Sequence, residues 1–167
     1  VDRRGKRYAV IITTSKGHNM FTKIVVGFDG SDSAERALWL ACDISKKYKS
    51  EAHLVHTPQP QTVAFAMGAM AGYAAVTTMP PPEDVKAAND EMIGMAHTIS
   101  QDCGVTLAQT HLKQGDPGDV MVAYADKCGA DLIVMGRRGL GALGAIVQGS
   151  TSLRVNHLAK CATLSVI

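Results

Sequence analysis

The fold is decided by the stretch MGRRGLGALGAIVQGSTS, residues 135–152. An apolar run over 131–135 leads into it and predicts a buried strand, and a helical pattern over 153–160 follows it. Glycines between a strand and a helix let backbone N–H groups approach an anion, because no Cβ atom stands in the way. The N-terminus of the helix adds unpaired N–H groups and a partial positive charge, and Ser150, Thr151 and Ser152 add hydroxyl groups. The stretch therefore predicts a phosphate-binding cradle.

Two common phosphate-binding motifs fit this stretch only in part. Gly139, Gly141 and Gly144 have the spacing of the dinucleotide fingerprint. That fingerprint opens the first strand–helix–strand unit and is followed about 20 residues on by an acid. Here it lies near the C-terminus, and the corresponding residue is Leu164. A Walker A loop over 144–150 lacks the lysine before its hydroxyl residue, which argues against P-loop hydrolysis.

A third spacing uses Gly136, Gly139 and Gly149, with Ser150 directly after the last glycine. It resembles the ATP-binding signature of the universal stress protein family, and the segment KIVVGFDGS, residues 23–31, looks like the opening strand of that family. The resemblance extends over residues 20–167, which are expected to form one universal stress protein domain behind a basic N-terminal extension, 1–19. The alternative, that these glycines only make turns and pack a helix against a strand, stays open.

Hydrophobic patterns typical of strands and helices alternate along the chain. This alternation predicts an α/β fold, an open parallel sheet of five strands with helices on both faces. The strand order 3-2-1-4-5, as in Rossmann-like and adenine nucleotide α-hydrolase-like folds, is implied by the resemblance. Strands are expected at 23–28, 51–57, 105–113, 131–135 and 163–167, and helices at 32–48, 83–103, 117–128 and 153–160.

Helix starts and buried faces follow from the spacing of side chains. Asp32 and Glu35 have the spacing of a capping box, with Ser31 as the rival cap. Asp116 before Pro117 predicts the N-cap of a later helix. Helical periodicity predicts which residues face the core: Ala34, Ala37, Leu38, Ala41, Cys42 and Ser45, then Val85, Ala88, Met92, Met95, Ala96 and Ile99, then Val120, Ala123, Tyr124 and Cys128.

The resemblance implies a site for ATP, with Mg²⁺ or Mn²⁺ bridged by the phosphates. The triphosphate is expected on backbone N–H groups of 136–139 and 149–152, with Asp29 near the ribose or the metal. His56 and Thr57 are the candidates for the wall beside the adenine, and Thr57 is the better one. The full set of expected contacts is Gly27, Phe28, Asp29, Thr57, Met135, Gly136, Arg138, Gly139, Gly149, Ser150, Thr151 and Ser152.

No catalytic residue and no protein metal site is expected. The sequence shows no arrangement of a nucleophile with a base that would mark a catalytic centre. His53 and His56 are three residues apart in a predicted strand, so they should point to opposite faces of the sheet rather than share a metal.

Charge and cysteine usage limit the remaining function classes. The net charge is +2, and residues 1–19 carry five basic residues against Asp2 alone, a net +4 that leaves −2 for the rest of the chain. A slightly acidic domain offers no electrostatic footprint for nucleic acid. The four cysteines have neither metal nor redox spacing and are expected to be small buried residues in a reducing compartment, the cytoplasm. No apolar run approaches the ~18 residues of a membrane span.

Three functions remain open. The first is an ATP-binding regulatory stress-response protein that acts through a nucleotide-dependent dimer and docks to a partner such as a transporter or kinase. The second is a slow enzyme that hydrolyses ATP or transfers a nucleotidyl or phosphoryl group, and the third is a nucleotide-independent interaction module.

Two segments bear on partners. The family commonly forms a homodimer through the last strand, where Ala162 stands here in place of the usual proline and Ser165 interrupts the apolar run. The segment 58–82, with prolines at both ends, is expected to be either a lid or docking segment or a passive insertion.

Overall fold

The computed structural model describes residues 20–58, 81–139 and 149–167. The predictions made for residues 1–19, for most of the proline-bounded segment and for Gly141 and Gly144 lie outside these described residues.

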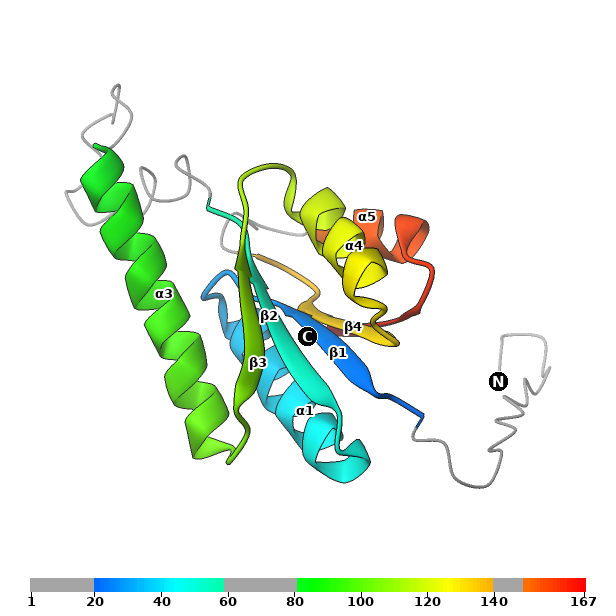
Figure 1. Cartoon of the computed structure of the whole chain (residues 1–167). Helices are drawn as coiled ribbons and strands as arrows, with labels where there is room; N and C mark the ends of the chain where they lie inside the picture. Colours follow the sequence, from blue (N-terminus) through cyan, green and yellow to red (C-terminus); the bar gives the residue numbers. More distant parts are fainter. Residues whose placement is uncertain (1–19, 59–80, 140–148) are drawn as a thin grey trace.

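The centre of the molecule is a parallel sheet of five strands in the order β3-β2-β1-β4-β5. This confirms the predicted fold class and strand order (Figure 1). β1 is the middle strand, so its C-terminal end lies between the ends of β2 and β4. The strands are β1 Lys23–Gly27, β2 Glu51–His56, β3 Leu107–Leu112, β4 Leu132–Gly136 and β5 Ala162–Val166.

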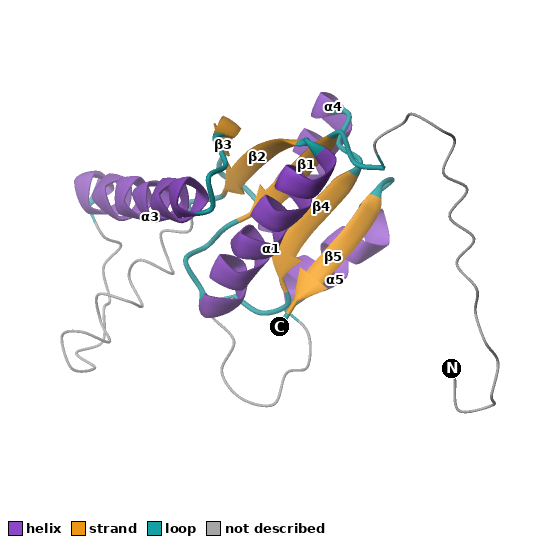
Figure 2. Ribbon diagram, turned by 90° about the horizontal axis from the view of Figure 1, so that it is seen from below, coloured by secondary structure: helices purple, strands orange, loops and turns teal. Residues whose placement is uncertain are grey.

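In the described part of the chain, four helices cover the two faces of the sheet. Figure 2 shows α1 in front of the sheet and α4 and α5 behind it, with α3 at the side of β2 and β3. The helices are α1 Asp32–Tyr48, α3 Pro82–Asp102, α4 Pro117–Cys128 and α5 Ser150–Leu158. The right-handed crossovers of a parallel sheet require helices on both faces once the strand order reverses after β3.

Helix caps decide where α1 and α4 begin. Ser31 is the N-cap of α1, and its side chain accepts a hydrogen bond from the N–H of Ala34. The preferred prediction, Asp32, is wrong, because Asp32 is already the first helical residue. Asp116 caps α4 as predicted and accepts from the N–H of Asp119. Side-chain acceptors at these positions satisfy N–H groups that have no partner inside the helix.

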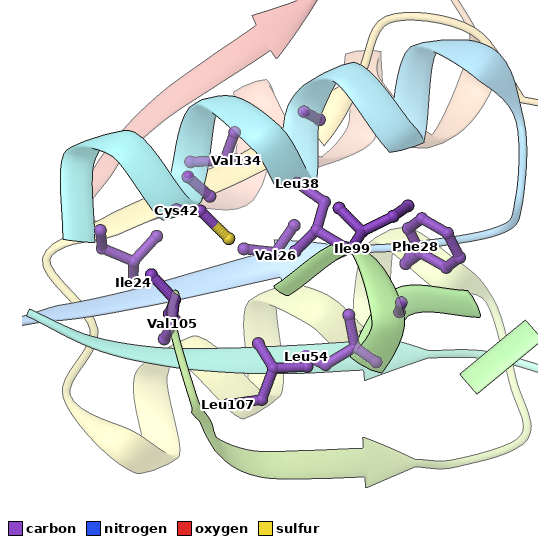
Figure 3. Close-up of a cluster of buried hydrophobic side chains, with 14 of the residues drawn as sticks. Ile24, Val26, Phe28, Leu38, Cys42, Leu54, Ile99, Val105, Leu107 and Val134 are labelled. Atoms are coloured by element: carbon purple, nitrogen blue, oxygen red, sulfur yellow. The ribbon is translucent and has the colours of Figure 1, made fainter. Parts of the chain in front are cut away.

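Two hydrophobic clusters separate the sheet from its helices. One lies between the sheet and the helices α1 and α3, and the other lies between the sheet and the helices α4 and α5. In Figure 3, Leu38 and Cys42 of α1 lie over Val26 of β1, beside Ile99 of α3. All six residues predicted for the buried face of α1 are buried. Small residues on this face let the helix lie close to the sheet.

The predicted buried faces of α3 and α4 are correct only in part. In α3 only Ala96 and Ile99 of the predicted stripe are buried, whereas Met95 is 40% exposed. The first half of α3 extends beyond the body of the sheet, so its apolar residues have less to pack against (Figure 2). In α4, Ala123 is exposed, and the buried residues include Met121 and Ala125 instead.

Candidate nucleotide-binding site

The ends of β1 and β4 bring the opening strand and the glycine segment together. The two strands pair side by side in the sheet, and Asp29 follows β1 by two residues. A Cβ atom on Gly139 would lie 2.5 Å from Oδ2 of Asp29. The carboxylate therefore lies directly against the backbone of the second glycine of the predicted motif.

A local turn holds the Asp29 side chain in place. Oδ1 of Asp29 accepts hydrogen bonds from the backbone N–H of Ser31 at 3.0 Å and from the Ser31 hydroxyl at 2.7 Å. Such a turn is common for aspartate next to a helix start, because its short carboxylate reaches backbone donors two residues on.

The segment after β4 is attached to the N-terminus of α1. The hydroxyl group of Ser33 donates a hydrogen bond to the carbonyl oxygen of Arg138. A Cβ atom on Gly136 would lie 2.9 Å from the backbone nitrogen of Ala34, which is too close for a side chain. Gly136 is thus required by the packing of α1 against β4. For this glycine, the alternative interpretation, that it packs a helix against a strand, is correct.

The third glycine holds the start of α5. Gly149 is the N-cap of α5, and no side chain caps this helix. The N–H of Gly149 donates to the carbonyl oxygen of Arg137 at 2.8 Å, and the buried hydroxyl of Ser152 donates to the same oxygen at 3.0 Å. The Gly149 amide is therefore used inside the protein, and the helix presents to a ligand the N–H groups of its first turn, at Ser150 and Thr151.

Arginine side chains give the site its positive charge. The Nε atoms of Arg137 and Arg138 are buried and have no hydrogen-bond partner among the described residues. Nε of Arg36 donates to the carbonyl oxygen of Ile167 at 2.7 Å. These three arginines line an open pocket of about 470 Å³ together with Ser31, Ser33 and Gly139. Guanidinium groups and hydroxyls in one pocket suit an anion such as a phosphate.

The C-terminal end of β2 supplies a further wall. Thr57 is 9% exposed and directly follows the strand. His56 is 5% exposed, and both of its ring nitrogens are bonded, one to the Phe28 carbonyl and one to Asn89. The side chain of His56 therefore belongs to the interior, which leaves Thr57 as the better candidate on this wall.

Three of the expected contact residues, Gly27, Phe28 and Met135, present no side chain to a ligand. Phe28 and Met135 are 4% and 2% exposed and belong to the two hydrophobic clusters. A Cβ atom on Gly27 would lie 3.0 Å from Sδ of Met121, so this glycine faces α4. A ligand could reach Phe28 and Met135 only through their main-chain atoms.

A second group of polar side chains lies on the face of the sheet that α4 covers. Nδ1 of His53 lies 2.9 Å from the Tyr124 hydroxyl, and the His111 ring stacks on the Tyr124 ring with centroids 4.3 Å apart. Partial burial, Lys127 and Lys113 lower the pKa of His111. His53 and His56 do point to opposite faces, as predicted. The ring stack could not be predicted from residue spacing, because β3 and α4 meet only in the fold.

Metal and membrane features can be assessed for the described ranges. Within residues 20–58, 81–139 and 149–167, no group of three His, Cys, Asp or Glu side chains could hold a metal ion. No helix in these ranges is long and apolar enough to cross a membrane.

Comparison with known sequences points to one family. A sequence model described as the universal stress protein family matches residues 20–166. A universal stress protein of Thermus aquaticus is 34% identical over 148 residues, which cover 88% of this chain and 99% of the relative. Another, of Methanocaldococcus jannaschii, is 28% identical over 161 residues, which cover 96% of this chain and 91% of the relative.

Solved structures show the same fold. The universal stress protein UspA from Lactobacillus plantarum has a TM-score of 0.68 at 21% identity and covers 87% of this chain and 97% of its own. A universal stress protein from Archaeoglobus fulgidus has a TM-score of 0.65 at 26% identity, covering 87% and 98%. A universal stress protein solved in complex with cAMP has a TM-score of 0.60 at 26% identity, covering 88% and 97%.

Proposed function

We propose, from the premise that this chain belongs to the universal stress protein family, that it is a regulatory protein whose ligand is ATP. The observation that carries the proposal is the contact between the Asp29 carboxylate and Gly139 beside a helix end that no side chain caps. An acid for the ribose and a helix N-terminus for the phosphates then lie at the same edge of the sheet. The relative solved with cAMP supports an adenine nucleotide as the ligand class.

Each group of residues at this edge of the sheet has a role in the proposed binding of ATP. The N–H groups of Ser150 and Thr151 bind phosphate oxygens, assisted by the guanidinium of Arg138. Asp29 binds the ribose hydroxyls, or a metal ion held by the phosphates. Thr57 borders the adenine. Mg²⁺ or Mn²⁺ would neutralise phosphate charge when bound, and Asp29 is the acidic side chain that the site supplies for it.

Binding is tested by calorimetric titration of the full chain with ATP, ADP, AMP and cAMP, with and without Mg²⁺. Wild type should bind ATP, and Gly149→Val should weaken binding by at least about tenfold, because a side chain there collides with the Arg137 carbonyl that aligns α5. Gly94→Ala is the matched control, because no atom lies within 4 Å of a Cβ at Gly94. No response of wild type at millimolar ATP, or equal binding by Gly149→Val, contradicts the proposal.

The same samples separate binding from slow hydrolysis. ADP or AMP that accumulates over many turnovers, and that Asp29→Ala abolishes while nucleotide still binds, would identify an enzyme. Unchanged ATP after prolonged incubation would support a ligand-binding regulator.

We further propose that the protein forms a homodimer through β5, and that this dimer docks to a protein partner. β5 is an edge strand of the sheet, and its Ser165 hydroxyl is buried without a partner among the described residues. An edge strand presents backbone donors and acceptors that a second copy can pair with across a two-fold axis. Sedimentation with and without ATP tests this, and a monomer at micromolar concentration under both conditions would contradict it.

The free cysteines bear on location. Cys42, Cys103, Cys128 and Cys161 form no disulfide, and the first two are buried. Unpaired cysteines suit a reducing compartment, so we place the protein in the cytoplasm.

A further inference from the structure

Asp29 is held from two sides by the same helix, α3. The first connection runs through His56, whose Nδ1 lies 2.8 Å from the carbonyl oxygen of Phe28. A carbonyl can only accept, so Nδ1 carries the proton and donates. The Phe28 carbonyl belongs to the planar peptide unit that ends in the backbone nitrogen of Asp29. His56 therefore fixes the orientation of the peptide group from which Asp29 starts.

Asn89 of α3 in turn holds the His56 ring. Oδ1 of its side-chain amide lies 2.8 Å from Nε2 of His56, and Asn89 and His56 are 7% and 5% exposed. The side-chain amide of Asn89 carries both an acceptor oxygen and an NH₂ donor, so it can hydrogen-bond Nε2 of the ring. Removal of this amide would leave a buried nitrogen without a partner and would release the ring.

The second connection is a packing contact on the other side of Asp29. Gly30 has φ +78°, and a Cβ atom there would lie 2.7 Å from Sδ of Met92. Met92 thus lies against the backbone of Gly30, and a residue with a side chain at position 30 would collide with it. Asn89 and Met92 are three residues apart, so they project from the same face of α3.

We propose that α3 sets the position of the Asp29 carboxylate, with Asn89, His56 and Met92 as positioning residues for the nucleotide. This rests on the proposed function, in which Asp29 binds the ribose or a phosphate-bound metal. The three residues act through the Asp29 turn and do not touch the nucleotide themselves. A partner that moved α3 would therefore change nucleotide affinity.

The position of the turn can be tested without any nucleotide. The backbone N–H of Ser31 donates to Oδ1 of Asp29, so its hydrogen exchange reports on this turn. Asn89→Leu and Met92→Ala should each accelerate exchange at Ser31 selectively. Ile99→Val is the matched control, because Ile99 is a buried residue of the same helix that takes no part in either connection. Unchanged exchange at Ser31 in both test variants would overturn the proposal.

A double-mutant cycle then tests the effect on binding. Asn89→Leu should weaken ATP binding by about tenfold in the wild-type background and by less than about twofold in the Asp29→Ala background. Met92→Ala should behave in the same way, which keeps the test available if Asn89→Leu does not fold. Equal losses in the two backgrounds, or none in either, would show that α3 does not act through Asp29. If wild type binds no nucleotide, the proposed function fails, while the exchange measurement still decides the positioning role.

Discussion

Asp119 and Arg154 join α4 to α5 through two hydrogen bonds, from Nε to Oδ1 at 2.6 Å and from Nη2 to Oδ2 at 2.7 Å. Asp116, the N-cap of α4, lies 3.4 Å from the same Nε atom. A Cβ atom on Gly118 would lie 3.1 Å from Cβ of Arg154, so the arginine stem packs closely on the first turn of α4. Arg154 lies one turn after the N–H groups proposed to bind phosphate, and the pair therefore aligns that end of α5 with α4.

The pair predicts a pH dependence of stability that Arg154→Met should remove. The Arg154 guanidinium holds the pKa of Asp119 below its usual value, so the pair stabilises the fold at pH above the usual aspartate range. This stability is lost as pH falls through the lowered pKa of Asp119. In thermal denaturation, Arg154→Met should melt below wild type near neutral pH, and the difference should vanish in strong acid and shrink in high salt. Lys86→Met, which removes a more exposed ion pair, should not change the melting temperature; an equal drop in both variants would contradict the prediction.

Gly136→Ala should destabilise the protein by about 1–3 kcal/mol, because the added methyl group meets the backbone of α1, which cannot move aside easily. Chemical denaturation measures the change. Gly94→Ala should instead stabilise the protein by about 0.5–1 kcal/mol, since Gly94 lies in a helix with open space around it. Equal stability of Gly136→Ala and wild type would show that α1 does not require this glycine.

Gly27→Ala should cost less than Gly136→Ala, about 1 kcal/mol or below, although its Cβ atom would also be crowded. The crowding atoms here are the far end of the Met121 side chain, which can change rotamer. The same denaturation experiment ranks the two variants, and the reverse order would refute this distinction between flexible and rigid neighbours.

Acidification should weaken the fold through His111. Partial burial, Lys127 and Lys113 lower the pKa of His111 below its usual value, so the folded state disfavours the charged ring. The corresponding stability is present above the usual histidine pKa and is lost as pH falls through the lowered one. His111→Phe keeps an aromatic ring on Tyr124 but cannot titrate, so its melting temperature should fall less than that of wild type over this range. Identical pH profiles would contradict the assignment.

Cys42 should resist alkylation in the folded protein. Burial and a hydrogen bond with Cys103 raise the pKa of Cys42 to about 12, so almost no thiolate is present near neutral pH. Mass spectrometry of protein treated with iodoacetamide should show modification at Cys128 and Cys161, which are half-buried, before Cys42. Modification of Cys42 at the same rate as Cys128 in folded protein would be inconsistent with this burial.

Local signals were enough to predict most of the fold. Strand–helix alternation gave the layers, and Asp116 before Pro117 gave the start of α4, because a cap depends on a few neighbouring residues. The strand order implied by the family resemblance puts Asp29 and Gly136 on opposite sides of one crevice, and Gly139 of the same segment lies against the Asp29 carboxylate.

The predictions of burial and of helix starts that differ from the structure do so for physical reasons that the periodicity of the sequence cannot show. Met95 fits the apolar stripe of α3, yet it is 40% exposed, whereas Ala96 and Ile99 beside it are buried in the core. Asn89 is buried because His56, 33 residues earlier, supplies its partner. α5 begins at Ser150 rather than Leu153, because Gly149 and not a polar side chain caps it. Each outcome depends on contacts between segments far apart in the sequence.

The central place of β1 has a consequence for biosynthesis. This strand leaves the ribosome first among the five, yet one of its two edges stays open until β4, more than a hundred residues later, has been translated. Until then its apolar residues and unpaired backbone groups are exposed to wrong pairing, the hazard of sheets built from distant segments. Nascent chains that stall before residue 136 should therefore depend on chaperones, and release of the last quarter of the polypeptide should be the step that completes folding.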